Sequence, residues 1–591
     1  MTYKEKLTAI REQMQADHVQ AYLIPSADPH MSEYLPKHYK CIPFASGFRG
    51  SAGTLVITAD FAGLWTDARY FEQATEQLDG SGFELVKLRV QHMPEYIQWL
   101  ADTLPAGSVV ASDEKLLSIL SADLLTKTLS GKDITLTHKD YLGPIWEDRP
   151  ELPTDAAFLI EEQHIGQTVS AKLREVREAL TKYQADYHLV SSLDDIAWLF
   201  NIRGKDVSYN PVVLSFALIS QDHAKLYINP AKLTEAEKQA LLKNGVEVFP
   251  YEEIETALSH LPENSSIFID PKRNCYAYLK VLPASVTVIK DTNPSTILKA
   301  VKNKTELANT RTAMIKDGVA LTRFFKWISE NIGKIKITEL SAAAKLRSYR
   351  EAQEGFVGDS FTTISAYKAH GALPHYSASE ESDAELQPES LFLVDSGGQY
   401  FYGTTDVTRT ISLGTNTEEE CVDYTLVLKG MIDGCKLRFP KGTCGYQVDA
   451  ITRKPIWEQG INYGHGTGHG VGYFLNVHEG PQVLNPTNNP VAIELGMITS
   501  IEPGIYRPGK HGIRIENLVT TIPAAATEFG DFYAFEALTI APISTSIVKK
   551  ELLEQSQIQW LNAYNAMVFE KLSPFLTEEE NNWLKTETQA I

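Results

Sequence analysis

The chain has 591 residues, more than the roughly 250 to 300 at which a single hydrophobic core stops growing, so we expect two to four domains. Hydrophobic residues make up 43% and charged residues 22%, a composition that excludes a largely disordered chain. The formal net charge is −20, which repels phosphate backbones and anionic lipids. We therefore expect neither nucleic acid nor a membrane surface as a partner.

The N-terminal residues 1–12 mix charges with apolar residues at helical spacing and lack the continuous apolar core of a signal peptide. No uncharged apolar run approaches the roughly 20 residues that a transmembrane helix needs. The five cysteines are odd in number and show no C-x-x-C spacing, as expected for reduced thiols. These features together predict a cytoplasmic protein.

Two stretches in the first half share an order of features, which indicates an internal repeat. Residues 21–28 and 46–53 form the first stretch, and residues 187–194 and 196–204 form the second. Each has an amphipathic segment, an apolar strand-like run, a small-polar turn and an Arg-Gly element. We therefore expect two related α/β domains, over residues 1–150 and 151–300, separated by the proline-rich segment 143–153.

A third domain is expected over residues 301–591. Asn303 and Glu306 have capping-box spacing, and apolar or small positions follow at helical steps, which predicts a long amphipathic helix. These positions are Met314, Gly318, Leu321, Phe325 and Ile328. From about residue 355 to 540, short strand-like runs alternate with glycine-rich turns, and this pattern predicts curved antiparallel sheet.

A helical extension is predicted from about residue 545, with a mostly apolar face that ends near Pro574. The positions on this face are Ile558, Leu561, Asn565, Val568 and Leu572. Such a face packs on its own domain or forms a subunit contact, and the sequence does not decide between these two alternatives.

Carboxylates recur within apolar runs of the third domain. Asp395 and Asp406 lie in two runs that we predict to be neighbouring strands of a hairpin joined through a glycine turn. A single such Asp is equally well explained by hydrogen bonds to backbone N–H groups. Because a buried ionised carboxylate is costly unless it is paired or bound to a metal, two on adjoining strands indicate a cation.

Histidines and two further carboxylates follow downstream. His465 and His469 lie in a glycine-rich segment that lets a ligand approach the backbone closely, and His478 comes nine residues after His469. Glu502 and Glu516 each lie among apolar residues in segments that resemble strands. The burial cost that applies to Asp395 and Asp406 applies to these two glutamates as well.

Taken together, these residues predict a site for two divalent ions. The proposed ligands are Asp395, Asp406, His469, Glu502 and Glu516. Four carboxylates in one cavity need compensating positive charge. Oxygen-rich ligation with one nitrogen favours manganese, cobalt or zinc, and leaves the choice among these three open. A pair of ions about 3.5 to 4 Å apart lowers the pKa of a shared water, so the implied reaction is metal-assisted hydrolysis.

At these residues the sequence resembles the metallopeptidases with the pita-bread fold, and over nearly its whole length it resembles the three-domain cytosolic Xaa-Pro aminopeptidases. The shared segments, in chain order, are V-D-S-G, G-T-T-D-V-T-R-T, H-G-T-G-H-G-V-G, E-P-G and G-I-R-I-E-N. Further shared segments are residues 65–70, 146–150 and 195–204. The resemblance implies two creatinase-like α/β domains followed by a pita-bread catalytic domain.

The resemblance also implies roles for the metal ligands. Asp406 and Glu516 would bridge the two ions, with Asp395 on one ion and His469 and Glu502 on the other. Manganese is the expected metal, with zinc or cobalt as alternatives. Glu502 would act as general base toward the water held between the ions. A homodimer is expected on the same basis.

Further residues are expected to contact the substrate, a peptide with proline at position two. His375 and His478 match histidines that stabilise the tetrahedral intermediate and act on the leaving nitrogen, and His465 is a third catalytic candidate. Arg514 and Tyr506 are expected to bind substrate near the proline. Arg69, from the first domain, is expected to contact the peptide beyond the proline. For His370 no role is assigned, and we predict a surface position.

Competing interpretations share parts of this pattern. Prolidase has the same ligands but cleaves only dipeptides, and its usual chain has two domains. Methionine aminopeptidases lack the large N-terminal half, and creatinase lacks the metal ligands. A non-catalytic module that binds peptides or histones is an alternative from another class. The complete set of five ligands argues against that module.

Overall fold

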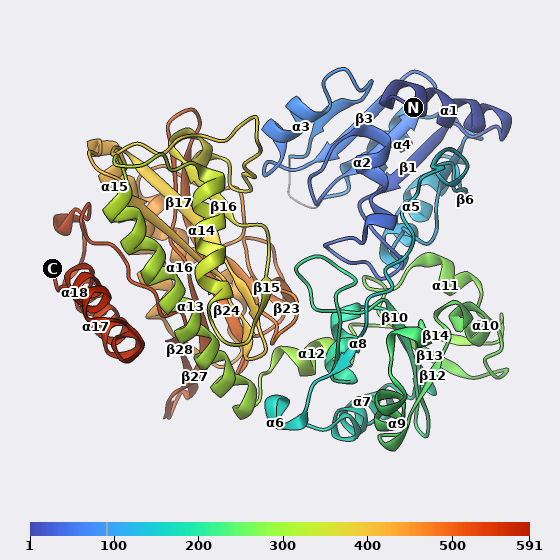
Figure 1. Cartoon of the computed structure of the whole chain (residues 1–591). Coiled ribbons are helices and arrows are strands. Elements are labelled where there is room, and N and C mark those ends of the chain that lie inside the picture. The colour runs from blue at the N-terminus through green and yellow to red at the C-terminus, as the bar shows by residue number, and fades with distance from the viewer. Residues whose placement is uncertain (90–92) are drawn as a thin grey trace. The chain divides into compact units, whose positions relative to one another are not determined.

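The structure, a computed structural model, describes residues 1–89 and 93–591 (Figure 1). The chain forms two compact units. The first comprises Met1–Glu161 and Gln167–Thr296, and the second comprises Glu162–Gly166 and Ile297–Ile591. Over the described ranges, none of the helices combines the length and apolar character that crossing a bilayer requires.

The described part of the first unit contains two six-stranded sheets. The first has the order β4-β3-β2-β1-β5-β6 and the second the order β12-β11-β10-β8-β13-β14. The strands of the first sheet are β1 (Ala21–Pro25), β2 (Thr54–Thr58), β3 (Ala62–Thr66), β4 (Glu84–Lys87), β5 (Val109–Ser112) and β6 (Thr135–His138). Those of the second are β8 (Tyr187–Val190), β10 (Ser215–Ser220), β11 (Ala224–Ile228), β12 (Val246–Phe249), β13 (Ser266–Ile269) and β14 (Thr287–Lys290).

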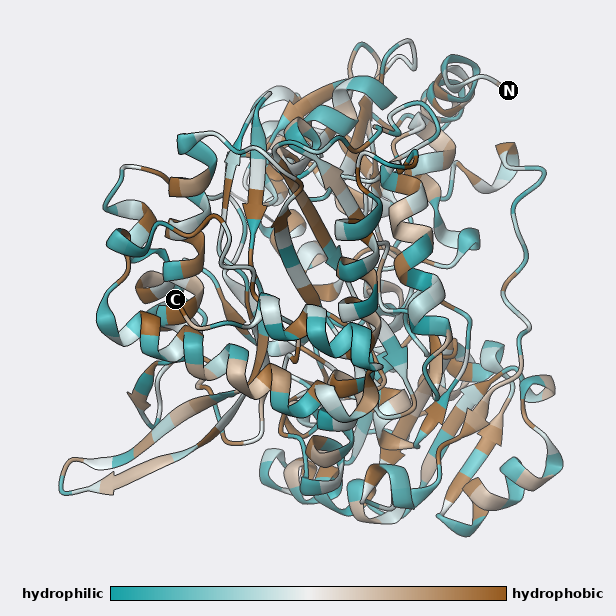
Figure 2. Ribbon diagram, turned by 60° about the vertical axis from the view of Figure 1, so that its left-hand side comes forward, coloured by the Kyte–Doolittle hydropathy of each residue, from teal (hydrophilic) through white to brown (hydrophobic). Residues whose placement is uncertain are grey.

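The two sheets have the same topology, which confirms the prediction of two related α/β domains. Strand β1 is antiparallel to β2 and parallel to β5. Strand β8 is likewise antiparallel to β10 and parallel to β13. The longer helices of this unit are α1 (Tyr3–Ala16), α4 (Glu95–Thr103), α5 (Ile119–Ser130), α7 (Val169–Tyr183) and α9 (Glu235–Lys243). Figure 2 shows hydrophobic residues concentrated in strands, while the helices mix hydrophobic and hydrophilic residues.

The second unit opens with the long helix that the sequence predicts. Helix α13 spans Lys304–Asn331, and Asn303 forms a capping box with Glu306 at its start. All five positions of the predicted face are buried: Met314, Gly318, Leu321, Phe325 and Ile328. At Gly318 a Cβ atom would lie 2.0 Å from the carbonyl oxygen of Ile540, so this glycine lets the helix approach a neighbouring segment closely.

Beyond α13 and α14 (Glu339–Glu351), antiparallel strands dominate, as predicted. Two three-stranded sheets have the orders β15-β18-β19 and β16-β17-β20, and a six-stranded sheet has the order β21-β28-β27-β24-β22-β23. The strands of the small sheets are β15 (Phe356–Asp359), β16 (Ile364–Tyr367), β17 (Leu391–Ser396), β18 (Gly398–Tyr400), β19 (Gly403–Thr404) and β20 (Val407–Ser412). Those of the large sheet are β21 (Arg438–Pro440), β22 (Gly468–Gly470), β23 (Glu479–Leu484), β24 (Ile498–Ile501), β27 (Asn517–Thr527) and β28 (Gly530–Ala537). A separate hairpin pairs β25 (Gly504–Arg507) with β26 (His511–Arg514).

Two helices interrupt the stretch that the sequence analysis assigned to sheet. They are α15 (Glu418–Cys435) and α16 (Gly445–Trp457). Gly430 and Gly434 lie inside α15, where a Cβ would come within 2.6 and 2.7 Å of Thr452 atoms on α16. These glycines are weak helix formers but permit close helix packing. Because the glycines in this stretch indicate turns, the sequence pattern did not predict helix α15.

The predicted C-terminal helix is confirmed as α17 (Gln555–Leu572), followed by α18 (Glu578–Glu587). The predicted face of α17 is buried, and Leu561, Val568 and Leu572 join the hydrophobic core of the same unit. Of the two alternatives for this face, packing on its own domain is therefore the one that the structure shows.

Candidate metal centre

Asp395 and Asp406 lie on or beside paired strands, but not in the simple hairpin that the sequence analysis predicted. Asp395 lies in β17, opposite Thr408 of β20, and Asp406 directly precedes β20. Between β17 and β20 the chain makes a second hairpin, β18–β19, which belongs to another sheet. Gly397 permits this detour, since a Cβ there would lie 2.0 Å from the carbonyl oxygen of Thr405.

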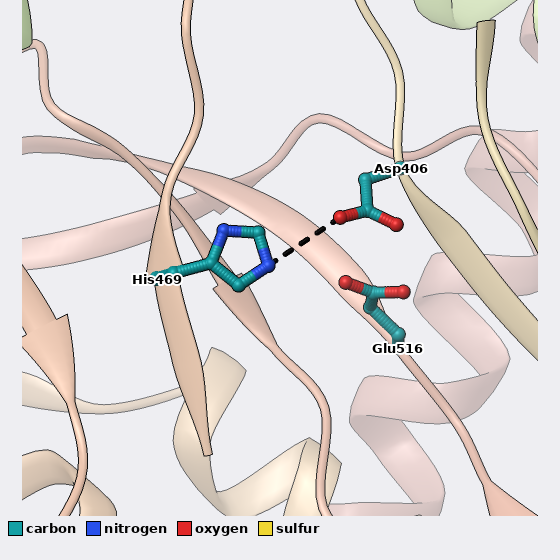
Figure 3. Close-up of side chains that lie close together, drawn as sticks. All are labelled: Asp406, His469 and Glu516. Atoms are coloured by element: carbon teal, nitrogen blue, oxygen red, sulfur yellow. Dashed lines mark ion pairs between the residues drawn. The ribbon is translucent and has the colours of Figure 1, made fainter. Parts of the chain in front are cut away.

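His469 lies on β22 and faces the carboxylates. Its Nε2 is 3.5 Å from Oδ2 of Asp406 and 3.4 Å from Oε1 of Glu502. Its Nδ1 is 2.8 Å from the carbonyl oxygen of Gly470, so donation to that carbonyl leaves Nε2 free to act as a ligand. Figure 3 shows His469, Asp406 and Glu516 pointing toward one another, and their ligand atoms lie within 4.8 Å of each other.

The remaining two carboxylates carry oxygens that the protein leaves unsatisfied. Glu516, 1% exposed, accepts a hydrogen bond from Oγ1 of Thr408 at 3.0 Å through Oε2. Oε1 of Glu516 and Oδ1 of Asp395 are buried and have no hydrogen-bond partner among the described residues. Buried polar atoms are normally satisfied, so these two oxygens fit a role as metal ligands.

The pKa values of the clustered groups are raised, as expected for buried carboxylates that lie close together. Burial raises the pKa of Glu502 to about 7, with Asp406 adding to the rise. Burial and the neighbouring carboxylates also raise the pKa of Glu516 well above its usual value. Burial lowers the pKa of His469, but Asp406 and Glu502 outweigh it and raise that pKa to about 9. Divalent cations would satisfy all of these groups in their deprotonated forms.

The donor set therefore fits divalent ions. The residues that would hold them are Asp395, Asp406, His469, Glu502 and Glu516. Oxygen donors with one imidazole and no thiolate suit manganese, cobalt or zinc. All five side chains come from the second unit, at the ends or within strands β17, β20, β22, β24 and β26–β27.

A chain of hydrogen bonds runs outward from the metal site. Nη2 of Arg514 donates to Oδ2 of Asp395 at 2.6 Å, and Nη1 donates to the hydroxyl oxygen of Tyr506 at 2.6 Å. The same Tyr506 oxygen lies 2.7 Å from Nε2 of His465. The structure thus brings three of the predicted substrate-side residues together beside the ligands.

His478 contacts a proposed ligand, and His375 follows a residue that contacts Arg514. The ring centroid of His478 is 4.4 Å from that of His469, in an edge-to-face arrangement. His375 follows Pro374, whose carbonyl oxygen accepts a hydrogen bond from Nη2 of Arg514 at 3.3 Å. Both catalytic candidates therefore neighbour groups of the metal site, and their roles stay predictions.

Arg69 and His370 are not part of the group around the metal site. Arg69 belongs to the first unit, where its guanidinium forms two hydrogen bonds with Asp67, at 2.7 and 2.8 Å, and its contact with peptide stays a prediction. The surface position predicted for His370 holds only in part. Its side chain is only 31% exposed, and Nδ1 lies 2.9 Å from Oε1 of the buried Glu339.

Sequence reasoning missed three residues that support the ligands. Thr408 donates to Glu516, and its Oγ1 also accepts a hydrogen bond from Nε of Arg514 at 3.3 Å. Ser500 Oγ accepts from the backbone N–H of His469 at 3.0 Å and donates to Oε1 of Glu502 at 3.2 Å. Arg409 donates to the carbonyl oxygen of Glu516. Thr408 lies two residues from Asp406, and Ser500 lies two residues from Glu502. Because side chains two residues apart on a strand point to the same face, this spacing could have identified both residues.

The family comparisons match the chain in four segments. Residues 6–147 and residues 148–306 each match a creatinase/prolidase N-terminal domain. Residues 308–522 match metallopeptidase family M24, and residues 531–591 match the C-terminal region of that peptidase group.

Full-length relatives decide the family. A protein of Sordaria macrospora named "Probable Xaa-Pro aminopeptidase P" is 38% identical over 99% of this chain and 98% of its own length. A protein of Aspergillus flavus with the same name is 39% identical over 99% of this chain and 92% of its own length. The chain belongs to the Xaa-Pro aminopeptidase P family.

A solved structure of this family matches the whole fold. The X-prolyl aminopeptidase of Caenorhabditis elegans, described as a cytosolic enzyme with a di-nuclear active site, is 34% identical. It covers 100% of both chains with a TM-score of 0.96. An Xaa-Pro dipeptidase of Bacillus anthracis, 23% identical with a TM-score of 0.50, shares the fold over 64% of this chain. Membership of the Xaa-Pro aminopeptidase P family confirms the predicted fold class of two creatinase-like domains and an M24 domain.

Proposed function

We propose that this protein is a metal-dependent aminopeptidase that hydrolyses the bond between the N-terminal residue and a proline at position two. The observation that carries the proposal is the buried cluster of four carboxylates and one histidine in a chain of this family. Two of its carboxylate oxygens are buried without a hydrogen-bond partner in the described part of the chain. The expected metal is Mn²⁺, and Zn²⁺ and Co²⁺ fit the same donors.

The ions, when bound, supply Lewis acidity and lower the pKa of a water. Asp406 and Glu516 would hold both ions, as the family resemblance implies, and their ligand atoms lie in one small cluster with His469. Asp395 would hold one ion, and His469 with Glu502 the other. Thr408 and the Nδ1–H of His469 orient these ligands through the hydrogen bonds described above.

Glu502 is proposed as the general base that accepts the proton of the attacking water. Its side chain is 17% exposed and buried among the other carboxylates, and bound ions would hold it in the deprotonated form that accepts a proton. Ser500 donates to Oε1 at 3.2 Å and so fixes the orientation of the carboxylate.

The scissile bond explains the histidines. An Xaa-Pro bond is a tertiary amide without an N–H, and its nitrogen must gain a proton as the bond breaks. His478, next to His469, and His375 are proposed to stabilise the tetrahedral intermediate and to protonate the leaving nitrogen. His465, Tyr506 and Arg514 are proposed to line the site around the proline ring.

Prolidase and a non-catalytic binding module are the competing functions. Metal-stripped protein is assayed on Arg-Pro-Pro, Ala-Pro and Ala-Ala, with manganese, cobalt or zinc restored in turn. Release of arginine from Arg-Pro-Pro without cleavage of Ala-Ala supports the proposal and ranks the metals. Cleavage of Ala-Pro alone supports prolidase, and binding of peptide without hydrolysis under any metal supports the module.

Cellular location and assembly complete the proposal. We propose a cytoplasmic homodimer, supported by the five free cysteines and by the relative from Caenorhabditis elegans that is described as cytosolic. Light scattering coupled to size exclusion measures the mass directly. A mass near 65.8 kDa, that of one chain, would contradict the dimer.

A further inference from the structure

A fully buried carboxylate outside the metal centre holds the segment that carries His375. Glu339 is the first residue of α14 and is 0% exposed. Its backbone N–H donates to the carbonyl oxygen of Ala384 at 3.0 Å, and its carbonyl oxygen accepts from Oγ of Ser365 at 2.7 Å. Ser365 and Ala384 are the first and last residues of the chain segment 365–384, which includes His375.

The side-chain oxygens of Glu339 collect donors from four places along this segment. Oε1 accepts from the backbone N–H of Tyr367 at 2.7 Å and lies 2.9 Å from Nδ1 of His370. Oε2 accepts from the hydroxyl of Tyr376 at 2.8 Å and from the backbone N–H of Ala384 at 3.1 Å. One carboxylate thus fixes residues 367, 370, 376 and 384 at once.

His370 and Tyr376 reinforce each other within this arrangement. Their rings stack with centroids 4.5 Å apart and an interplanar angle of 24°. With Nδ1 donating to Glu339, the imidazole of His370 forms one wall beside the Tyr376 ring. This gives His370 a structural place in the segment, which the sequence left without a role.

The segment also contacts the β25–β26 hairpin, which carries Tyr506 and Arg514. A Cβ on Gly512 of β26 would lie 1.6 Å from the carbonyl oxygen of Gly371, so the two backbones touch. Two residues beyond Gly512, Arg514 donates to the carbonyl oxygen of Pro374 at 3.3 Å. His375 therefore lies between Pro374, held by Arg514, and Tyr376, held by Glu339.

From this geometry we infer that Glu339 is a positioning residue for His375, acting through His370 and Tyr376. The inference rests on the proposed hydrolysis of Xaa-Pro bonds. Removal of the carboxylate would leave several buried donors unsatisfied and release the segment. A displacement of about 1 Å in a catalytic group lowers turnover by up to about 100-fold.

The central variant is Glu339→Gln, which keeps the size of the side chain but turns an N–H₂ group toward donors. Glu389→Gln is the matched control, because Glu389 pairs with Lys368 of the same segment and its side chain is 54% exposed. His370→Phe keeps an aromatic ring beside Tyr376 without a donor. All variants are studied as full chains with both metal sites loaded.

Two measurements test the inference. Hydrogen exchange should speed up in residues 367–384 of Glu339→Gln, with unchanged metal content, and should stay unchanged in Glu389→Gln. On Arg-Pro-Pro, the kcat of Glu339→Gln should fall about 10- to 100-fold, with less than a threefold change in KM. The kcat of His370→Phe should also fall, but by less. Unchanged exchange in Glu339→Gln would overturn the inference.

A double-mutant cycle separates positioning from general structural damage. In a His375→Ala background, Glu339→Gln should lower kcat little further, because the group it positions is gone. Multiplication of the two losses would overturn the inference. If the unaltered protein with both ions bound does not cleave Arg-Pro-Pro, the proposed function fails, while hydrogen exchange still decides whether Glu339 holds the segment.

Discussion

Nη2 of Arg514 lies 2.6 Å from Oδ2 of Asp395, and both side chains are largely buried. The contact joins a candidate substrate residue to a candidate metal ligand. It also brings a fixed positive charge to the carboxylate cluster, since Nε of Arg514 is 4.0 Å from Oε2 of Glu502.

Replacing Arg514 should therefore destabilise the metal-free protein more than the loaded one. Arg514→Met leaves Asp395 buried without its partner, which typically costs about 3 to 5 kcal/mol. Bound ions would offset much of this loss by pairing with the same carboxylate. Thermal unfolding with chelator and with excess Mn²⁺ measures both values, and equal losses in the two conditions would count against a metal at Asp395.

The metal-free protein should lose stability as the pH rises from about 4.5 to about 9. The pKa of Glu502 rises from 4.5 in the unfolded chain to about 7 in the fold, so its contribution to stability is full below 4.5 and disappears through 7. The pKa of His469 rises from 6.5 to about 9, so its contribution disappears between those values. Metal binding reverses the trend, because ions bind the deprotonated ligands.

Melting temperatures across this pH range, with and without Mn²⁺, measure the effect. Glu502→Gln should flatten the metal-free curve between pH 4.5 and 7. If the metal-free protein instead became more stable toward pH 9, Glu502 and His469 would not be protonated in the absence of ions.

The number of bound ions should depend on which aspartate is removed. Asp406 shares one small cluster with His469 and Glu516, whereas Asp395 is paired with Arg514. Asp406→Asn should therefore lose both ions, and Asp395→Asn should keep one. Elemental analysis after dialysis gives the ratio of metal to protein. Retention of both ions by Asp406→Asn would refute its bridging role.

A buried group of ion pairs around Glu479, the residue after His478, should stabilise the fold. Glu479 lies 3.1 Å from Nζ of Lys299 and also pairs with Lys302, and all three side chains are at most 2% exposed. Glu479→Gln removes the buried carboxylate that Lys299 and Lys302 share and should lower the free energy of unfolding by about 3 to 5 kcal/mol.

The control for this prediction is Glu354→Gln, which breaks the pair with Lys316. Glu354 is 83% exposed, so the loss should stay below about 1 kcal/mol. Urea unfolding of both variants gives the comparison. If Glu479→Gln loses no more than Glu354→Gln, the buried cluster does not stabilise the fold as argued.

Sequence patterns anticipated the elements whose signals are local. The capping box at Asn303 and the apolar face of α13 follow directly from spacing, and so does the buried face of α17. The four proposed carboxylate ligands were recognisable because carboxylates in apolar strands stand out, and His469 because it lies in a glycine-rich segment.

Other features depend on contacts between distant residues. Helix α15 contains Gly430 and Gly434, which weaken the local helical signal and are useful only because α16 packs against them. The partnership of Glu339 with His370 joins residues 31 positions apart, and nothing in the local pattern marks either residue. The β18–β19 hairpin was missed because the close approach of Gly397 to Thr405 is a tertiary feature.

Metal-dependent cleavage of the Xaa-Pro bond is tested most directly by the release of free arginine from Arg-Pro-Pro as Mn²⁺ is titrated into metal-stripped protein. We expect no release without metal and a maximum rate when two ions are bound per chain. Glu502→Gln, compared at equal metal content, should stay inactive. Release by the stripped protein, or no release with two ions bound, would show that the protein is not a two-metal Xaa-Pro aminopeptidase.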